Sequence, residues 1–148
     1  METASNNYSE ICHRYYKYKA KFFGGKKLNY WDRNAPYPKQ KELKINWNEA
    51  KSIVVNAYSE FDDRFGKIAN LFFENSWIHA TVKKGKTSGA FSHPTVPSCH
   101  PCILINYQGK IRDVMTLAHE LGHGIHQYLA NKNGVLLADT PLTLAETC

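Results

Sequence analysis

Residues 45–76 carry one apolar stripe at helical spacing, and this stripe constrains the fold more than any other feature of the chain. Side chains that recur every three or four residues lie on one face of an α-helix. The stripe consists of Ala50, Ile53, Val54, Ala57, Tyr58, Phe61, Phe65, Ile68, Ala69, Phe72 and Phe73. An apolar face of this length must pack against other helices or a sheet. We therefore expect one long amphipathic helix over 45–76 in a mainly α domain.

The segments on either side of this stripe predict a helix and a few short strands. Apolar side chains at helical spacing over 7–23 are followed by Gly24-Gly25, so we expect a helix that ends there. Residues 26–43 are interrupted by Asn and Pro, which favours an extended connection. Residues 77–107 are β-rich pieces broken by Gly and Pro. We expect two or three short strands in this segment.

The C-terminal third of the chain predicts two more helices. Arg112-Asp113 reads as the start of a helix over 114–129, which stops near Asn133-Gly134. Thr140-Pro141 is an N-cap residue followed by Pro, which is typical of a helix start, so a short last helix should begin there. These elements predict a mainly α fold with a small β-sheet (α+β). At 148 residues, a single domain over 1–148 is expected.

The sequence His119-Glu120-Leu121-Gly122-His123 lies on the predicted helix over 114–129. Positions four apart are separated by about 40° around a helix, so both imidazoles project from one face and can hold one Zn²⁺. Glu120 is offset around the helix, where its carboxylate can reach a water molecule that the metal activates. The pattern predicts zinc ligands at His119 and His123 and a general base at Glu120.

A third ligand is needed to complete such a site. The extended metzincin pattern would require Gly at 126 and His at 129, where this chain has His126 and Leu129, so that class is excluded. A Glu from the following helix is the remaining arrangement, with Glu146 as the main candidate and Asp139 as the lesser one. His126 shares the face of the two predicted ligands. It could contact substrate or support a ligand, and a His bonded to a backbone carbonyl is an equal alternative.

The net charge of +6 lies entirely in the first 44 residues, which hold 10 basic and 4 acidic side chains. Residues 14–23 are basic and rich in Tyr, a composition that can track a nucleic-acid backbone. A solvated helix with long Lys stems over apolar surface is the favoured interpretation. No apolar run approaches the roughly 18 residues of a spanning helix, and no secretory signal opens the chain. We expect no membrane partner, no nucleic acid and a cytoplasmic location.

Four cysteines are present, and without a secretory signal we expect reduced thiols. Cys99 and Cys102 match a C-x-x-C redox pattern. A redox site of this kind needs its first Cys at a helix N-terminus, whereas the residues that follow Cys102 predict a strand. A zinc ribbon would need a second such pair. The spacing is therefore interpreted as a chance occurrence.

Several stretches of the chain resemble oligoendopeptidase F, of the thimet oligopeptidase-like zinc peptidases. They occur in the same order as in that family and span nearly the whole chain from about Tyr15. The stretches are YWDRNAP at 30–36, GKTSGAFS at 85–92, NYQG at 106–109, RDV at 112–114, TLAHELGHGIHQYL at 116–129 and DTPLTLAET at 139–147.

This resemblance implies a part of a mostly helical, zincin-type catalytic domain in a cytosolic enzyme that cleaves short peptides. It implies one Zn²⁺ per chain, held by His119, His123 and Glu146, with Glu120 as the catalytic base. It also implies that the strand around 88–92 pairs with extended substrate, with Gly89, Ala90 and Phe91 as substrate-binding residues. A tight turn without a ligand is the alternative for that segment.

Family members are several times longer, and this sequence ends two residues after Glu146. We therefore expect a truncated piece that binds zinc weakly and has little activity alone. One alternative is a split peptidase, which needs a separate C-terminal chain. Its mark would be uncovered Phe61, Phe65, Phe72 and Phe73. A non-enzymatic basic binding module is the other alternative.

Overall fold

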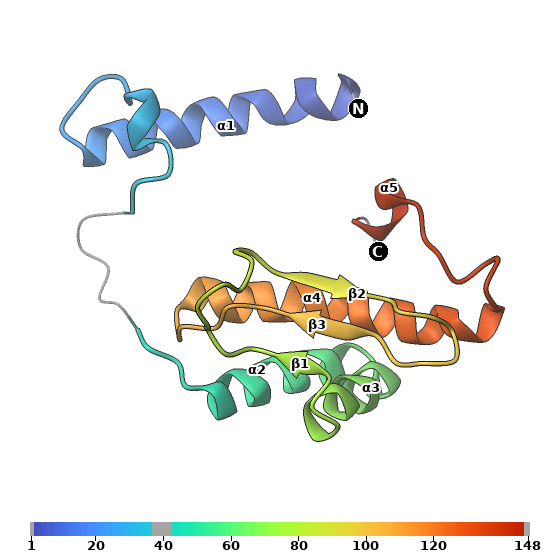
Figure 1. Cartoon of the computed structure of the whole chain (residues 1–148). Helices are drawn as coiled ribbons and strands as arrows, with labels where there is room; N and C mark the ends of the chain where they lie inside the picture. The colour runs from blue at the N-terminus through green and yellow to red at the C-terminus, as the bar shows by residue number, and fades with distance from the viewer. Residues whose placement is uncertain (1, 37–42, 147–148) are drawn as a thin grey trace. The chain divides into compact units, whose positions relative to one another are not determined.

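The computed structural model describes residues 2–36 and 43–146. The chain divides into two compact units, Met1–Lys41 and Glu42–Cys148, and each unit is described by itself. Figure 1 labels α1 in the first unit, and the sheet and the other labelled helices in the second. Within the described residues, no helix has the length and apolar character needed to cross a membrane. The cytoplasmic location and the single domain over 1–148 stay predictions.

The first unit consists of α1 (Glu2–Phe22) and a 3-10 turn, η1 (Tyr30–Asp32). Lys19 is buried, and its Nζ donates a hydrogen bond of 2.7 Å to the backbone carbonyl of Arg33. This contact ties the last turns of α1 to the segment that follows η1. The carbonyl compensates for part of the lost hydration of the ammonium group, which explains how a lysine is buried here.

The helix predicted over 7–23 is confirmed, but it begins earlier, at Glu2. Residues 2–6 contain neither Gly nor Pro, so nothing in them ends the helix before Asn7. The connection predicted to be extended over 26–43 contains the helical turn η1. Its residues 37–42 lie outside the part of the chain that the structure describes.

The single helix predicted over 45–76 is wrong, because the structure contains two helices there, α2 (Trp47–Phe61) and α3 (Asp63–Glu74). Asp62 between them has extended backbone, and its carboxylate accepts a hydrogen bond of 2.7 Å from the backbone N–H of Arg64. Asp is among the best N-cap residues because its side chain satisfies a free N–H of the first turn. Asp62 thus ends one helix and begins the next, although the apolar spacing continues across it.

The small sheet has three strands in the order β1–β3–β2. They are β1 (Ile78–His79), β2 (Phe91–His93) and β3 (Cys102–Leu104). β1 pairs with β3 in parallel and β2 pairs with β3 antiparallel, with Ser92 opposite Ile103. Three strands agree with the two or three predicted over 77–107, and Cys102 lies in a strand as expected. β2 is an edge strand, so one side of its backbone is not paired within the sheet.

The helix predicted over 114–129 is confirmed as α4 (Ile111–Ala130) and is followed by a 3-10 turn, η2 (Asn131–Asn133). It begins where the Asp113 carboxylate accepts hydrogen bonds from the backbone N–H groups of Gln108 and Lys110, at 2.8 and 3.0 Å. These bonds satisfy donors that a helix start would otherwise leave free.

The short last helix, α5, covers Leu142–Ala145. Pro141 rather than Thr140 is its N-cap residue, so the predicted start is wrong by one position. Pro141 has ψ of 139°, which is extended and not helical, so the first helical residue is the one that follows.

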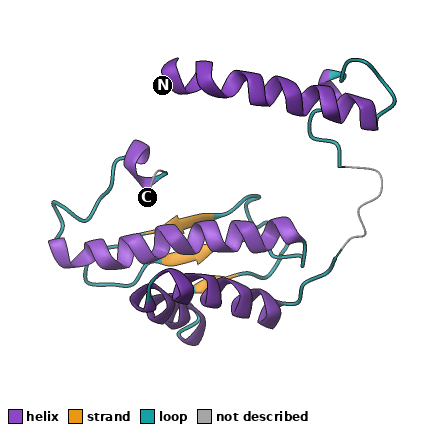
Figure 2. Cartoon of the chain, turned by 180° about the vertical axis from the view of Figure 1, so that it is seen from behind, coloured by secondary structure: helices purple, strands orange, loops and turns teal. Residues whose placement is uncertain are grey.

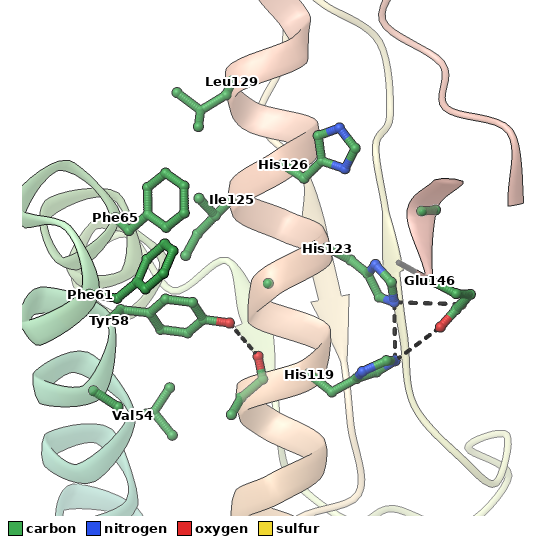
Figure 3. Close-up of a pocket in the computed structure, with 14 residues that line it drawn as sticks. Val54, Tyr58, Phe61, Phe65, His119, His123, Ile125, His126, Leu129 and Glu146 are labelled. Carbon is green, nitrogen blue, oxygen red and sulfur yellow. Dashed lines mark hydrogen bonds and ion pairs between the residues drawn. The ribbon is translucent and has the colours of Figure 1, made fainter. Parts of the chain in front are cut away.

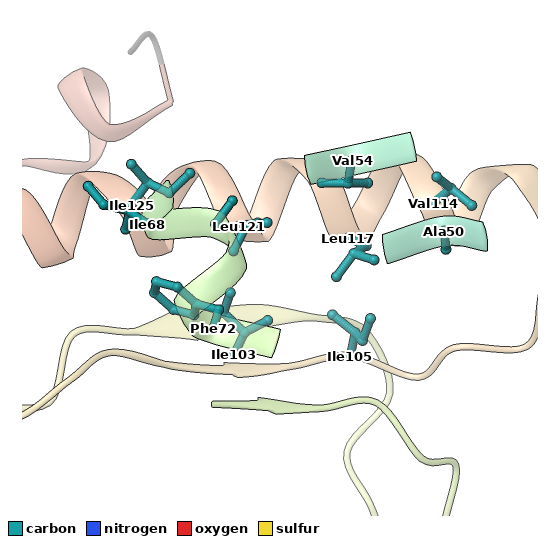
Figure 4. Packing of buried hydrophobic residues seen from close by; sticks show 11 residues of the cluster. Ala50, Val54, Ile68, Phe72, Ile103, Ile105, Val114, Leu117, Leu121 and Ile125 are labelled. Atoms are coloured by element: carbon teal, nitrogen blue, oxygen red, sulfur yellow. The ribbon is translucent and has the colours of Figure 1, made fainter. Parts of the chain in front are cut away.

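The hydrophobic core of the second unit lies between the sheet and the helices α2, α3 and α4 (Figures 2 and 4). The fold class is confirmed as mainly helical with a small three-stranded sheet. Gly124 lets α4 approach closely, because a Cβ there would lie 2.9 Å from the ring of Phe72. The buried apolar residues of the core are Ala50, Val54, Ile68, Ala69, Phe72, Ile103, Ile105, Val114, Leu117, Leu121 and Ile125.

The uncovered Phe side chains predicted for a split peptidase are found only in part. Phe72 has an exposed fraction of 0%, so its side chain is covered within this chain and that expectation is wrong for it. Phe61 is 78% exposed, whereas Phe65 and Phe73 are partly buried against the core. Of these four rings, the one at the end of α2 is therefore the most exposed.

Candidate metal centre

Helix α4 has one face in the core and another face turned toward α5 (Figure 3). Leu117, Leu121 and Ile125 recur every four residues and are buried. The two histidines His119 and His123 are offset from this row and project from the other side of the helix. The core packing therefore fixes the direction in which both imidazoles point.

The structure brings His119, His123 and Glu146 together. The Nε2 atoms of the two histidines are 3.1 Å apart. They lie 3.6 and 3.7 Å from the carboxylate oxygens of Glu146. A tetrahedral ion with ligands at about 2.0–2.1 Å holds them about 3.3–3.4 Å apart. The 3.6 Å distance joins His119 to Oε2 of Glu146, and the 3.7 Å distance joins His123 to Oε1. The two imidazole nitrogens and this carboxylate thus lie close enough together to hold one zinc ion.

Glu146 comes from a weakly packed segment. It follows the last residue of α5, and its backbone N–H donates to the carbonyl of Leu142 at 3.2 Å. Leu142 and Leu144 are exposed, and no described residue of α5 belongs to the buried core. The side chains of His119 and Glu146 are 55% and 51% exposed, against 18% for His123. The segment that carries the third donor thus lies outside the core, whereas α4, which carries the two histidines, packs in it.

Asp139, the lesser candidate for the third ligand, is not in this cluster. Its carboxylate accepts a hydrogen bond of 3.0 Å from the backbone N–H of Thr140. His126 is also outside the cluster, one turn further along α4, and lines an apolar cavity that the three residues of the cluster line as well (Figure 3).

Glu120 is only 8% exposed, although its neighbours on the helix are the two histidines of the cluster. Burial raises the pKa of the Glu120 carboxyl, and the charge of Glu146 raises it further. His119, His123 and the backbone N–H of Ser92 act in the opposite direction and lower that pKa. Glu120 lines a second cavity together with His119. Its carboxylate is therefore beside the cluster and is not one of the three donors.

Of the three substrate-binding residues predicted in the strand around 88–92, two line this second cavity and one does not. Gly89 and Ala90 line it together with His119 and Glu120. Among the described residues, the backbone N–H and C=O of Ala90 make no hydrogen bond. Phe91 does not line the cavity and is paired with β3. The free edge next to Glu120 is thus the backbone of Ala90.

Sequence reasoning missed Gln127 on α4. Its amide exchanges two hydrogen bonds with Ser92, accepting from the Ser92 hydroxyl at 2.8 Å and donating to the Ser92 carbonyl at 3.3 Å. These bonds fix β2 against α4 next to Glu120. No local pattern could have paired residues 35 positions apart.

Sequence reasoning also missed the role of Tyr58 of α2, which it assigned only to the apolar stripe. The Tyr58 hydroxyl donates a hydrogen bond of 2.7 Å to the backbone carbonyl of Ala118, the residue before His119. Gly122 makes room for it, because a Cβ there would lie 2.9 Å from the hydroxyl. Burial raises the pKa of Tyr58, so the hydroxyl keeps its proton and stays a donor. A hydroxyl on an otherwise apolar face was the available signal.

Replacing Tyr58 by Phe should lower the free energy of unfolding by about 0.5–1.5 kcal/mol, because one part-buried hydrogen bond is lost. Urea denaturation monitored by circular dichroism measures this change. Tyr128→Phe is the matched control, since no hydrogen bond of the half-buried Tyr128 hydroxyl is found among the described residues. Equal losses in both variants would contradict the prediction.

Comparison with known proteins identifies the chain. The sequence model of Peptidase family M3 matches residues 1–148. The chain belongs to this family. The M3 chain is 31% identical over 135 residues to an oligoendopeptidase F homolog of Borreliella burgdorferi, covering 90% of this chain and 22% of that protein. It is 27% identical over 128 residues to the oligopeptidase PepF of Bacillus subtilis, and the match covers 86% of this chain and 19% of that protein. It therefore spans about a fifth of the length of the curated relatives it matches.

Solved structures of peptidases also match the chain. One, described as a peptidase from Chlamydophila abortus, matches with a TM-score of 0.77 at 28% identity and covers 98% of this chain and 24% of that chain. An oligoendopeptidase F structure from Bacillus anthracis str. Ames matches with a TM-score of 0.67 at 23% identity. This match covers 83% of this chain and 23% of that chain. The second likeness concerns the fold alone. The resemblance to oligoendopeptidase F that the sequence indicated is confirmed.

Proposed function

We propose that this M3 chain carries the metal site and the general base of a zinc metalloendopeptidase that hydrolyses short peptides. His119, His123 and Glu146 would hold one Zn²⁺ per chain. The observation that carries this proposal is that the two Nε2 atoms are 3.1 Å apart and each lies within 3.7 Å of one of the two carboxylate oxygens of Glu146, which is close to the ligand spacing around one tetrahedral ion. Three protein ligands leave a fourth position open, as is typical of catalytic zinc.

Glu120 would act as the general base. When bound, zinc supplies a Lewis acid that polarises a peptide carbonyl and brings the pKa of a water molecule toward about 7. The Glu120 carboxylate takes the proton of the attacking water and passes it to the leaving amine. Two observations support this role: Glu120 is not one of the three donors, and it lines a cavity together with His119.

An extended peptide would pair with the free backbone of Ala90, directly before β2. The Ala90 backbone offers one N–H donor and one C=O acceptor beside Glu120, and such pairing is a common mode of peptide binding. Gly89 would allow a close approach, and Phe91 would keep the edge in register through its pairing with β3. His126 would contact an apolar substrate side chain, since it lines an apolar cavity of about 610 Å³ beside the cluster.

Zinc content per chain tests this proposal. Elemental analysis after gel filtration should find about one zinc in the wild-type chain and a loss of that zinc in His123→Ala. His126→Ala is the matched control, because it removes an imidazole from the same helix face outside the cluster. It should keep its zinc. Bound zinc should also raise the melting temperature of the wild-type chain and leave that of His123→Ala unchanged.

Equal zinc content in wild type and His123→Ala would overturn the ligand assignment. Absence of zinc from all three proteins would mean that the site does not assemble in this chain alone. A peptidase completed by a separate C-terminal chain would then be the better proposal. Phe61 favours this second candidate, because it is exposed and borders the apolar cavity beside the cluster.

A further inference from the structure

Arg112 of α4 lines the second cavity, and the proposed reaction gives this residue no role. It lines this cavity together with Gly89, Ala90, His119 and Glu120. Its side chain is exposed, and within the described part of the chain it makes no hydrogen bond or ion pair. The neighbouring Asp113 also lines this cavity, and its Oδ2 accepts two backbone hydrogen bonds at the start of α4. Arg112 thus presents a cation to the cavity that holds the general base.

The position of Arg112 on the helix relates it to the metal cluster. Seven residues separate it from His119, so the two side chains point within about 20° of the same direction and lie about 10.5 Å apart along the axis. A cation in the first turn of a helix is disfavoured by the helix dipole. Helix stability therefore gives no reason for an arginine at this position.

The direction of β2 relative to α4 decides which end of a bound peptide would face Arg112. Gly89 and Ala90 share a cavity with Arg112, whereas Ser92 is bonded to Gln127, near the other end of α4. β2 and α4 therefore run in the same direction, as Figure 1 shows. A peptide bound antiparallel to β2 would place its C-terminal residues toward Arg112. A parallel peptide would bring its terminal ammonium group there and be repelled.

We infer that Arg112 binds the C-terminal carboxylate of a peptide that pairs with the free backbone of Ala90 and runs antiparallel to β2. This inference rests on the function proposed above. An extended peptide advances about 3.3 Å per residue, so about 10 Å corresponds to about three residues beyond the cleaved bond. The guanidinium group matches a carboxylate through two parallel N–H donors. The site therefore selects short peptides with a free carboxylate at that distance.

Two dye-labelled peptides that differ only at the C-terminus test this inference. One ends in a free carboxylate and the other in an amide, and fluorescence anisotropy gives the Kd of each for the full zinc-treated chain. We expect the wild-type chain to bind the carboxylate form about tenfold more tightly. The ratio should fall to about one in Arg112→Gln. Lys67→Gln is the matched control, because it removes one exposed positive charge from α3 and should keep the ratio.

Each other outcome contradicts a defined part of this inference. Equal Kd values for both peptides in wild type, or a ratio that persists in Arg112→Gln, would overturn the role of Arg112 and leave the peptide site standing. Absence of binding of either peptide to wild type would overturn the proposed peptide site itself. A third peptide, amidated but ending in Glu, should bind like the amide. If it binds like the free carboxylate, Arg112 does not select the chain terminus.

Discussion

Replacing Glu120 by Gln should slow peptide hydrolysis by the zinc-loaded chain by about 10²–10⁴-fold, which is the contribution of a positioned general base. Gln has nearly the same size and keeps the packing of a side chain that is 8% exposed. Its amide cannot take a proton from water at neutral pH. Because Glu120 is not one of the three donors, the variant should keep its zinc.

Because the chain spans about a fifth of the length of its relatives, a low rate is expected. Products should be quantified by mass spectrometry at high protein concentration over hours, with zinc content matched by elemental analysis. Glu60→Gln is the control, since Glu60 is exposed on α2, and its rate should equal that of wild type. Equal rates in wild type and Glu120→Gln would exclude Glu120 as the base.

Replacing Phe72 by Ala should lower the free energy of unfolding by about 3–5 kcal/mol. The ring is completely buried, meets Trp77 edge-on at 5.1 Å between centroids, and lies against the position of Gly124 on α4. Domains are stable by only about 5–15 kcal/mol, so this loss is a large share of the total. Because Phe72 packs against α4, which carries both histidines, its replacement should also lower the affinity for zinc.

Urea denaturation monitored by circular dichroism measures the loss. Phe61→Ala is the matched control, because its ring is 78% exposed, and it should change the free energy of unfolding by less than about 0.5 kcal/mol. Should Phe72→Ala fail to fold, Phe72→Leu should give a smaller loss of the same sign. A loss in Phe72→Ala no greater than that in Phe61→Ala would contradict the core between α3 and α4.

Local features of the sequence were enough to predict most of the second unit. Apolar spacing placed α4 to within three residues at its start, because helical periodicity and the Asp113 cap act within a few positions. The same periodicity put His119 and His123 on one face, since four residues make little more than one turn. Gly and Pro divided 77–107 into the short strands that the structure contains. The family followed from motifs along the chain.

Tertiary structure decided the features that depend on residues distant in sequence. The apolar stripe could not reveal the break at Asp62, because two helices that pack on one core keep the same spacing as one. Spacing left both Asp139 and Glu146 open as donors, and only the path of the chain after α4 brought Glu146 to the histidines. The bond from Tyr58 to Ala118 joins residues 60 positions apart. The sequence alone thus determined the helix faces and the chemical groups on them, because these depend on neighbours within a turn. Which groups meet was decided by the packing of α2, α3, α4 and the sheet around one core.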